Sequence, residues 1–405
     1  MYIDRSMELA LTKLKSMFSI ILLTGSRQVG KTTLLKHLFQ DLPYLTLDDP
    51  TLLQSIVEEP GNFLKKHSPP LIIDEVQYAP ILFRYLKMKV DENNEKGQFF
   101  LTGSQQFHLM KNVSETLAGR IGIINLLGLS LREIQGVHDY DYFIPKEPFF
   151  QTRQKTVTKI SYWELWKIIH KGAMPALYAD NIDWQMFYSA YIKTYIERDV
   201  QQLTQVGDNL RFLTFMTVIA NRTGQLLNLT SIARDVGISI TTAERWLSIL
   251  LASNVIYLLA PFHNNRLKRA IKTPKLYFLD TGLAAFLTKW NNTEVLESGA
   301  MNGAFFETFV VGEILKSYFN AGILHPPLYF YRDKEGVEID LLIEINGFIH
   351  PLEINKSSNP TKSNIKAFDN LEKKVENIGE GGIICLYDDY LPIGKKHAII
   401  PVHWL

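Results

Sequence analysis

The chain has 405 residues, with 43 lysines and arginines against 42 aspartates and glutamates, a formal net charge of +1, and 46% hydrophobic residues. This near-neutral charge excludes a general electrostatic attraction to nucleic acid, so any basic surface must be local. The length and the hydrophobic content predict two or three domains with cores of their own. The single cysteine, Cys385, excludes an internal disulfide and is typical of a reducing cytosol, and no apolar run has the length of a membrane span. We therefore expect a cytoplasmic protein that has no membrane segment.

The first third of the chain alternates apolar strands with helical patterns. Five strands are predicted, near residues 19–23, 44–48, 70–74, 98–102 and 121–127. Short, fully apolar strands separated by helices indicate a parallel sheet that is covered on both faces. Residues 1–135 are therefore predicted to form an α/β domain.

A phosphate-binding loop follows the first of these strands. The pattern G-x-x-x-x-G-K-[ST] is matched at every fixed position by Gly25, Ser26, Arg27, Gln28, Val29, Gly30, Lys31 and Thr32, with Thr33 after them. The loop has an apolar strand before it and a helical pattern after it, so its N–H groups and the helix N-terminus would face phosphate oxygens. We expect Lys31 to reach the β- and γ-phosphates of ATP and Thr32 to ligate Mg²⁺. The alternative is a glycine-containing turn before an ordinary helix.

Two carboxylates end the third predicted strand. Asp74 and Glu75 follow an apolar run, at the strand end where ligands of parallel sheets bind. We expect Asp74 to hold Mg²⁺ through water and Glu75 to orient or deprotonate the attacking water. The alternative is a strand that runs out into a solvated acidic turn. After the next strand, Ser104 is a candidate contact for the γ-phosphate, although serine is also an ordinary turn residue.

The middle of the chain contains two further units. Residues 136–204 are predicted to be a linker or lid followed by a helical region. Residues 205–290 are predicted to form a winged helix-turn-helix, with helices at 229–236 and 241–251 and wing strands at 255–259 and 275–279. Basic residues that suit phosphate contacts lie between the wing strands: Arg266, Lys268, Arg269 and Lys272. Because winged helices also serve protein packing, duplex DNA and a protein partner both stay open.

Residues 291–405 are predicted to form a second α/β domain. Glu307 lies in a strongly apolar helix, while Asp340 and Glu353 lie in two apolar strands that are joined by the turn at 346–347. Acidic residues within apolar strands are costly unless they are paired or bind a metal. The three carboxylates could form an all-oxygen Mg²⁺ site. The alternatives are the solvated face of an edge hairpin and a hydrogen-bonded cluster that binds no metal.

The order of these motifs resembles that of the prokaryotic AAA-type P-loop ATPases that carry a C-terminal domain of unknown function. That domain is similar to the PD-(D/E)xK nuclease fold. The resemblance covers nearly the whole chain and rests on the segments 25–33, 47–50, 73–77, 117–120, 195–200, 275–283 and 338–340. It implies an α/β P-loop NTPase sheet, then a winged helix-turn-helix and a nuclease-like α/β domain, with ATP and Mg²⁺ as ligands.

The resemblance also raises two questions about individual residues. A working nuclease of this type has the triplet Glu-x-Lys, whereas this chain has Glu353, Ile354 and Asn355, and Lys356 comes one residue late. Lys356 would point to the opposite face of the strand, so we expect the nuclease-like site to be inactive. In AAA-type ATPases an arginine near the position of Arg120 often reaches a γ-phosphate in the same or a neighbouring subunit, which would require a homo-oligomer. The alternative for Arg120 is a structural ion pair.

The sequence therefore favours an ATP-binding and ATP-hydrolysing nucleotide switch, with a winged helix and an inactive nuclease-like domain. Two other functions stay open. One is an ATP-dependent nuclease that acts on DNA. The other is a protein-interaction regulator whose winged helix never contacts DNA.

Overall fold

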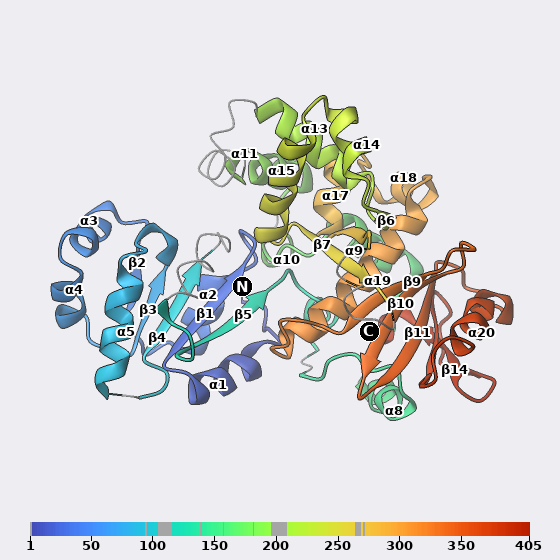
Figure 1. Ribbon diagram of the computed structural model, residues 1–405, viewed down its shortest axis with the longest axis horizontal. Helices are drawn as coiled ribbons and strands as arrows, with labels where there is room; N and C mark the ends of the chain where they lie inside the picture. Colours follow the sequence, from blue (N-terminus) through green and yellow to red (C-terminus); the bar gives the residue numbers. More distant parts are fainter. Residues whose placement is uncertain are drawn as a thin grey trace.

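A computed structural model describes residues 2–93, 95–103, 116–137, 140–156, 158–180, 182–195, 209–263, 269 and 272–405. Figure 1 shows three groups of elements: an N-terminal sheet with its helices, a helical group around α13, α14 and α15, and a C-terminal sheet. Ser104, Arg266 and Lys268, which the sequence analysis singled out, lie outside the described residues.

The N-terminal sheet contains the five strands that the sequence predicts. They are β1 (Ile20–Gly25), β2 (Tyr44–Thr46), β3 (Leu71–Asp74), β4 (Phe99–Gly103) and β5 (Ile121–Leu126). All pairings are parallel, and the strand order is β2-β3-β4-β1-β5. The predicted parallel sheet is therefore confirmed. Because β4 lies between β1 and β3, the segments that follow these three strands lie side by side at one edge of the sheet.

Helices cover both faces of this sheet. They are α1 (Glu8–Met17), α2 (Lys31–Leu38), α3 (Pro50–Glu58), α4 (Pro60–Lys66), the 3₁₀ turn η1 (Val76–Tyr78) and α5 (Leu82–Asn93). Side chains alternate along a strand. Ile20 and Leu22 of β1 accordingly pack with α3, α4 and α5, and Ile21 and Leu23 pack with α1 and α2. The core on the α1 and α2 side continues into the C-terminal half of the chain.

Helices dominate the region that the sequence analysis described as a linker and a helical region. They are α7 (Leu131–Ile134), α8 (Glu147–Thr156), α9 (Tyr162–Lys171), α10 (Ala176–Ala179) and α11 (Trp184–Tyr195). The segment that was expected to be a linker or lid thus contains α8, whose Phe150 packs against Tyr390 and Trp404 near the C-terminus. The sequence of α8 has only a weak amphipathic pattern, because part of the surface that buries this helix comes from residues far away in the sequence.

The next group has two helices joined by a glycine turn and followed by an antiparallel pair of strands. The elements are α13 (Asn209–Ala220), β6 (Gln225–Leu226), α14 (Leu229–Val236), α15 (Ile240–Ala252), β7 (Ile256–Pro261) and β8 (Lys275–Phe278), followed by α17 (Thr281–Leu287) and α18 (Thr293–Ser298). Gly237 ends α14 in the left-handed conformation, with φ of 74°. Strand β8 pairs with both β7 and β6.

The C-terminal group packs a long, almost fully buried helix against a large mixed sheet. Its elements are α19 (Asn302–Asn320), β9 (Leu328–Arg332), β10 (Glu338–Ile345), β11 (Phe348–Asn355), η3 (Lys362–Ile365), α20 (Lys366–Glu372), β12 (Gly381–Cys385), β13 (Leu391–Ile393), β14 (His397–Pro401) and η4 (Val402–Trp404). Within the described part of the chain, the sheet has nine strands in the order β13-β14-β12-β11-β10-β9-β7-β8-β6. Main-chain pairing of β7 with β9 therefore bridges the expected domain boundary between residues 290 and 291. We find no helix in the described ranges that is long and apolar enough to cross a membrane.

Candidate nucleotide-binding site

Glycine is required at two positions of the loop between β1 and α2. Gly25 has φ of 147°, and a Cβ atom there would lie 2.2 Å from the carbonyl oxygen of Leu126 on the neighbouring strand β5. Gly30 has φ of 92° and directly precedes α2. The loop can therefore lie close to β5 and then turn sharply into the helix, with its N–H groups at the helix N-terminus. This is the strand–loop–helix geometry that the sequence predicts.

Lys31 occupies the centre of this loop. Its side chain is 7% exposed, and its Nζ donates hydrogen bonds to the carbonyl oxygens of Gly25 (3.0 Å) and Ser26 (2.8 Å). A cation held on the loop backbone lies where the loop's N–H groups would bind phosphate oxygens.

Thr32 and Asp74 meet at the edge of the sheet. The Thr32 hydroxyl lies 3.0 Å from Oδ1 and 2.9 Å from Oδ2 of Asp74, and Asp74 is 6% exposed. They come together because β1 and β3 are parallel and end at the same edge. A hydroxyl beside a carboxylate is a hard oxygen donor set, which fits a Mg²⁺ ion that keeps several of its water ligands.

Two further hydroxyl groups hold the Asp74 carboxylate, and the sequence analysis missed both. Tyr44 on β2 donates to Oδ2 at 2.7 Å, and Thr102 on β4 donates to Oδ1. Burial and the hydrogen bond to Asp74 raise the pKa of the Tyr44 phenol. Thr102 could have been found from its place at the end of the strand next to β3. Tyr44 left no such signal, because only the strand order brings β2 beside β3.

Glu75 lies immediately beyond the end of β3. Its backbone is left-handed, with φ of 56° and ψ of 43°, and its N–H donates to Thr102 Oγ1 at 3.3 Å. The carboxylate is half-buried and accepts a hydrogen bond from Nε2 of Gln77. Burial raises the pKa of Glu75, while the Gln77 hydrogen bond and the charge of Lys31 oppose the rise. Glu75 is thus a carboxylate at the same edge as Lys31, Thr32 and Asp74.

Arg120 lies at the opposite edge of the sheet, so a contact with the γ-phosphate in its own subunit is wrong. It directly precedes β5, whereas the phosphate loop begins where the parallel strand β1 ends. Six strand residues, at about 3.3 Å each, separate the two edges by about 20 Å. Arg120 instead forms an ion pair with Asp91 of α5 at 2.5 Å. A role towards a neighbouring subunit stays a prediction.

Arg5 connects the phosphate loop to the rest of the chain and was not found from the sequence. This arginine is 4% exposed and donates to the carbonyl oxygens of Val29 (2.8 Å) and Leu127 (2.8 Å). Its Nε lies 3.1 Å from Oε1 of Glu133, which also caps α7 through Ser130. A guanidinium with fixed donors can satisfy several acceptors at once.

The contacts continue from α7 to α19. The N–H of Leu131 donates to Oε2 of Glu313 at 2.8 Å, and Lys316 Nζ donates to the carbonyl oxygen of Leu129 at 2.8 Å. Glu313 and Lys316 also form a buried ion pair. A continuous set of polar contacts therefore runs from the loop to the C-terminal helix α19.

The predicted carboxylate cluster forms around a lysine that the sequence analysis did not assign to it. Glu307 of α19, Glu338 and Asp340 of β10 lie 3.1, 2.5 and 3.6 Å from Nζ of Lys275 on β8. Tyr277, also on β8, donates to Oε1 of Glu307 at 2.6 Å. β10 lies inside the nine-stranded sheet and the side chain of Asp340 is 16% exposed, so a solvated edge hairpin is wrong.

Burial controls the protonation of this cluster. Burial and the Asp340 charge raise the pKa of Glu353 to about 9, and burial and Glu307 raise the pKa of Asp340 to about 7. Asn355 accepts a hydrogen bond from the N–H of Ser357 at 2.9 Å, and Lys356 is exposed. The cation of the cluster is therefore Lys275, which comes from a strand of the preceding unit.

The expected basic wing is also corrected at one position. Arg269 lies 2.6 Å from Glu344 of β10 and stacks over the rings of Phe262 and Tyr329. Its side chain thus packs against the C-terminal sheet and does not project as a phosphate contact. Lys272 is exposed.

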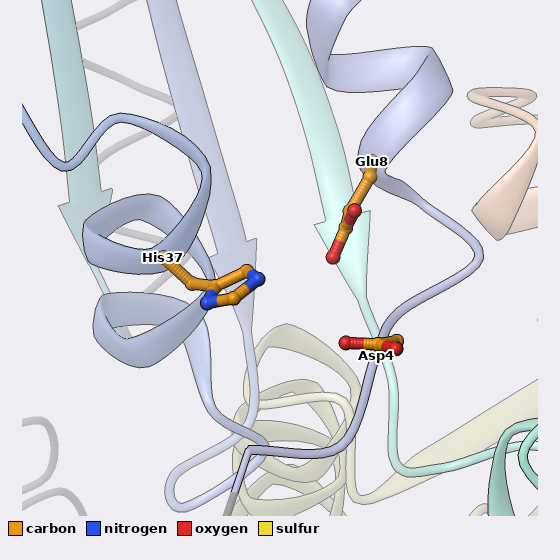
Figure 2. Close-up of side chains that lie close together, drawn as sticks. All are labelled: Asp4, Glu8 and His37. Atoms are coloured by element: carbon orange, nitrogen blue, oxygen red, sulfur yellow. The ribbon is translucent and has the colours of Figure 1, made fainter.

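One further group of side chains has the composition of a metal site. Figure 2 shows Asp4, Glu8 of α1 and His37 of α2, whose ligand atoms all lie within 4.8 Å of one another in the described part of the chain. Tyr2 donates to Glu8 at 2.8 Å and stacks on the His37 ring. Asp4 and His37 are exposed, and exposed groups of this kind are common without a metal, so we assign no metal to them.

Three family models match the chain. An AAA domain matches residues 17–135, and two domains of unknown function match residues 162–294 (DUF8612) and 302–405 (DUF4143). The AAA match contains the phosphate loop, Asp74 and Glu75. The two other models carry no functional description, so the likeness of the C-terminal part to a nuclease fold stays a prediction.

Solved structures with some likeness include AMPPCP-bound DnaA from Aquifex aeolicus and the RuvB Holliday junction branch migration motor of Thermotoga maritima. Both are 15% identical to this chain. The match to DnaA covers 61% of this chain and 86% of the DnaA chain, with a TM-score of 0.29. The match to RuvB covers 65% of this chain and 92% of the RuvB chain, with a TM-score of 0.28. TM-scores below 0.5 indicate too little structural likeness to assign a fold or a function to this chain from these structures.

Curated relatives are closer in sequence. The uncharacterized proteins Mb2031c of Mycobacterium bovis and Rv2008c of Mycobacterium tuberculosis are each 31% identical over 347 residues, which is 85% of this chain and 72% of theirs. The chain therefore belongs to the same family as these two mycobacterial proteins, and its N-terminal part is an AAA-type P-loop domain.

Proposed function

We propose that the protein binds ATP with Mg²⁺, hydrolyses it to ADP and phosphate, and acts as a nucleotide switch. The observation that carries the proposal is the convergence of Lys31, Thr32, Asp74 and Glu75 at one edge of the parallel sheet. Lys31 would bind the β- and γ-phosphates, and Thr32 and Asp74 would hold Mg²⁺ with its waters. Glu75 would accept a proton from the attacking water, and its raised pKa brings it closer to neutral pH, where a base is most effective.

Two substitutions separate binding from turnover. Lys31→Ala should lose most of the affinity for ATP together with hydrolysis, because it removes the cation of the loop. Glu75→Gln should keep the affinity and lose about 10²- to 10³-fold in rate, because it removes the proton acceptor. Fluorescent-nucleotide titration and phosphate release measure the two effects. Wild-type turnover in Glu75→Gln would contradict the assigned role.

The contacts from the loop to α19 support the switch. Nucleotide phosphates would compete for Lys31 and would act on the same loop whose Val29 carbonyl is held by Arg5. Arg5 binds Glu133 of α7. In the same segment, the N–H of Leu131 and the carbonyl oxygen of Leu129 bind Glu313 and Lys316 of α19. A change at the loop thus has a polar route as far as α19, the helix that packs against the C-terminal sheet.

Duplex DNA is the partner that we propose for the helix-turn-helix unit. Helix α15 buries Ala243, Trp246 and Leu250 and exposes Thr241 and Arg245, so one face is core and the other is available. We interpret the elements from α13 to β8 as a winged helix-turn-helix, in which the second helix of the turn enters the major groove. A protein partner is the other reading.

Salt-dependent binding to duplex DNA tests this partner. Fluorescence anisotropy of a labelled duplex should show binding that weakens with salt, both with and without ATP. Arg245→Ala should weaken binding, while Arg84→Ala, an exposed arginine on α5, should not. Equal affinity of both variants and the wild type would exclude contact through α15 and favour a protein partner.

We infer that the carboxylate cluster around Lys275 does not cleave DNA. The ammonium group already occupies Glu307, Glu338 and Asp340, which a Mg²⁺ ion would have to take over. Supercoiled plasmid with Mg²⁺ or Mn²⁺ should therefore stay intact. Robust nicking that Asp340→Ala abolishes would instead establish the ATP-dependent nuclease.

A further inference from the structure

Gln77 is a buried amide beside the proposed catalytic carboxylate, and the proposed function gives it no role. It lies in the 3₁₀ turn η1 directly after Glu75 and is 8% exposed. Its Nε2 donates a hydrogen bond to Oε2 of Glu75. Its Oε1 is buried and has no hydrogen-bond partner among the residues that the structure describes.

A half-satisfied buried amide is costly. An unpaired buried polar atom destabilises a fold, and an apolar side chain of the same size would avoid this cost. The adjoining backbone carries a second cost, because Glu75 has a left-handed φ of 56°. Both costs fall on Glu75 and Gln77, which follow β3 at the edge of the sheet where the phosphate loop also lies.

We propose that Gln77 is a positioning residue: its Nε2 holds the Glu75 carboxylate in the orientation that accepts a hydrogen of the attacking water. This inference rests on the proposed function. The water would donate one hydrogen to Glu75, with an oxygen lone pair directed at the γ-phosphorus. A fixed acceptor orients the attacking water better than a mobile one.

The chemistry balances with these groups. The water oxygen forms a bond to the γ-phosphorus, and the bond from the γ-phosphorus to the bridging oxygen breaks, with its electron pair leaving on ADP. Glu75 takes the proton that the water loses and later releases it. Gln77 neither gains nor loses a proton, so its contribution is geometry together with stabilisation of the ionised Glu75 carboxylate.

Two variants of Gln77 test the proposal. Gln77→Met keeps the length of the side chain and removes both polar atoms, whereas Gln77→Glu keeps the shape and places a second carboxyl beside Glu75. We expect kcat to fall about 10- to 100-fold in Gln77→Met, because a displaced reacting group costs this much. Equilibrium binding of ATP should stay within about threefold, since the phosphate loop is untouched.

The pH profile separates positioning from packing. The Gln77 hydrogen bond lowers the pKa of Glu75, so its loss should move the acid limb of the kcat profile to higher pH. In Gln77→Glu the added negative charge should move the limb further in the same direction. If the Gln77 side chain served only to fill space, Gln77→Met would leave this limb in place.

The chain offers a matched control in Gln98. It is also buried, at 2% exposed, with Nε2 bound to the Glu95 carbonyl at 3.1 Å and with an Oε1 that finds no partner in the described ranges. It precedes β4 and therefore lies at the edge of the sheet opposite to the loop. Gln98→Met should leave kcat and the pH profile unchanged.

The outcomes are distinguishable. A wild-type kcat and pH profile in both Gln77 variants, with Glu75→Gln inactive, would overturn this inference and leave the proposed function standing. Equal losses in Gln77→Met and Gln98→Met, with unchanged profiles, would also overturn it, because the effect would then be structural. A wild-type protein that binds ATP without hydrolysing it would overturn both.

Discussion

At the edge of the parallel sheet, three hydroxyl side chains bind one carboxylate, that of Asp74. Asp74 accepts hydrogen bonds from Thr32, Thr102 and Tyr44, which come from three different elements. Each hydroxyl restricts the orientation of the carboxylate, and groups that restrict a ligand in this way tune its metal. Thr32 would have to turn from Asp74 to Mg²⁺, whereas Tyr44 can keep its hydrogen bond.

We predict that Tyr44→Phe weakens the response to Mg²⁺. The Mg²⁺ concentration for half-maximal ATP hydrolysis should rise about tenfold, because loss of such an outer hydrogen bond typically costs 10- to 100-fold in metal affinity. Affinity for ATP in EDTA should stay unchanged, since Tyr44 does not belong to the phosphate loop. Tyr390→Phe, near the C-terminus, is the control. If the two variants respond alike to Mg²⁺, Tyr44 has no part in the site.

Much of this edge could be predicted residue by residue. The loop and the pair Asp74 and Glu75 are contiguous in sequence, and their chemistry depends on local spacing alone. Arg5 and Tyr44 could not be predicted, because an isolated arginine or tyrosine carries no pattern.

At the scale of elements, strand β8 and the residues that follow it contact two different parts of the molecule. Lys275 and Tyr277 are two residues apart on β8, so they share a face of the strand; Lys275 reaches carboxylates of α19 and β10, and Tyr277 reaches Glu307 of α19. Two residues after the end of β8, Asp280 caps α17 and accepts hydrogen bonds from the N–H of Ala173 and the hydroxyl of Tyr188, both at 2.7 Å. The segment 275–283 therefore ties the helix-turn-helix unit to its neighbours on two sides.

We predict that the free energy of unfolding falls as pH rises, because the folded protein keeps Glu353 protonated. Its pKa of about 9 and the pKa of about 7 of Asp340 exceed their ordinary values of 4.5 and 3.8. Between the ordinary and the raised pKa, the folded protein keeps a proton that the unfolded chain has lost, so the free energy of unfolding decreases with pH. The urea midpoint of the wild type should thus fall between pH 6 and pH 9, and it should fall less in Glu353→Gln.

The control for this effect is Glu335→Gln. Glu335 is 73% exposed in the connection between β9 and β10. Its replacement should leave the wild-type dependence on pH in place. A Glu353→Gln variant with the full wild-type slope would show that the cluster does not retain the proton.

At the scale of the whole molecule, the AAA-type domain and the C-terminal part share a core, and a buried ion pair within α19 contacts the main chain around α7. The side chains of Glu313 and Lys316 are 3% and 7% exposed, and both bind main-chain groups around α7. Figure 1 shows α19 extending from the C-terminal sheet towards the N-terminal unit. The two parts are therefore expected to unfold together.

We predict that Glu313→Gln destabilises the protein by about 3–5 kcal/mol, because it leaves the buried ammonium of Lys316 without its carboxylate. Urea unfolding, followed by tryptophan fluorescence and by circular dichroism, measures the loss. Glu92→Gln breaks the exposed pair with Lys89 and should cost less than about 1 kcal/mol. Similar losses in the two variants would show that the contact with α19 is unimportant for stability.

The sequence by itself determined the parallel sheet, the phosphate loop and the two carboxylates at the end of β3. These features depend on the periodicity of apolar residues and on short spacings, which act over a few residues. Only the tertiary structure decided which cation joins the carboxylates and where Arg120 lies. Lys275 reaches Asp340 of β10 although β9 and β7 lie between β8 and β10 in the sheet, and the parallel direction of β5 places Arg120 at the edge remote from the loop. Such contacts depend on packing between segments distant in sequence, which a local pattern does not record.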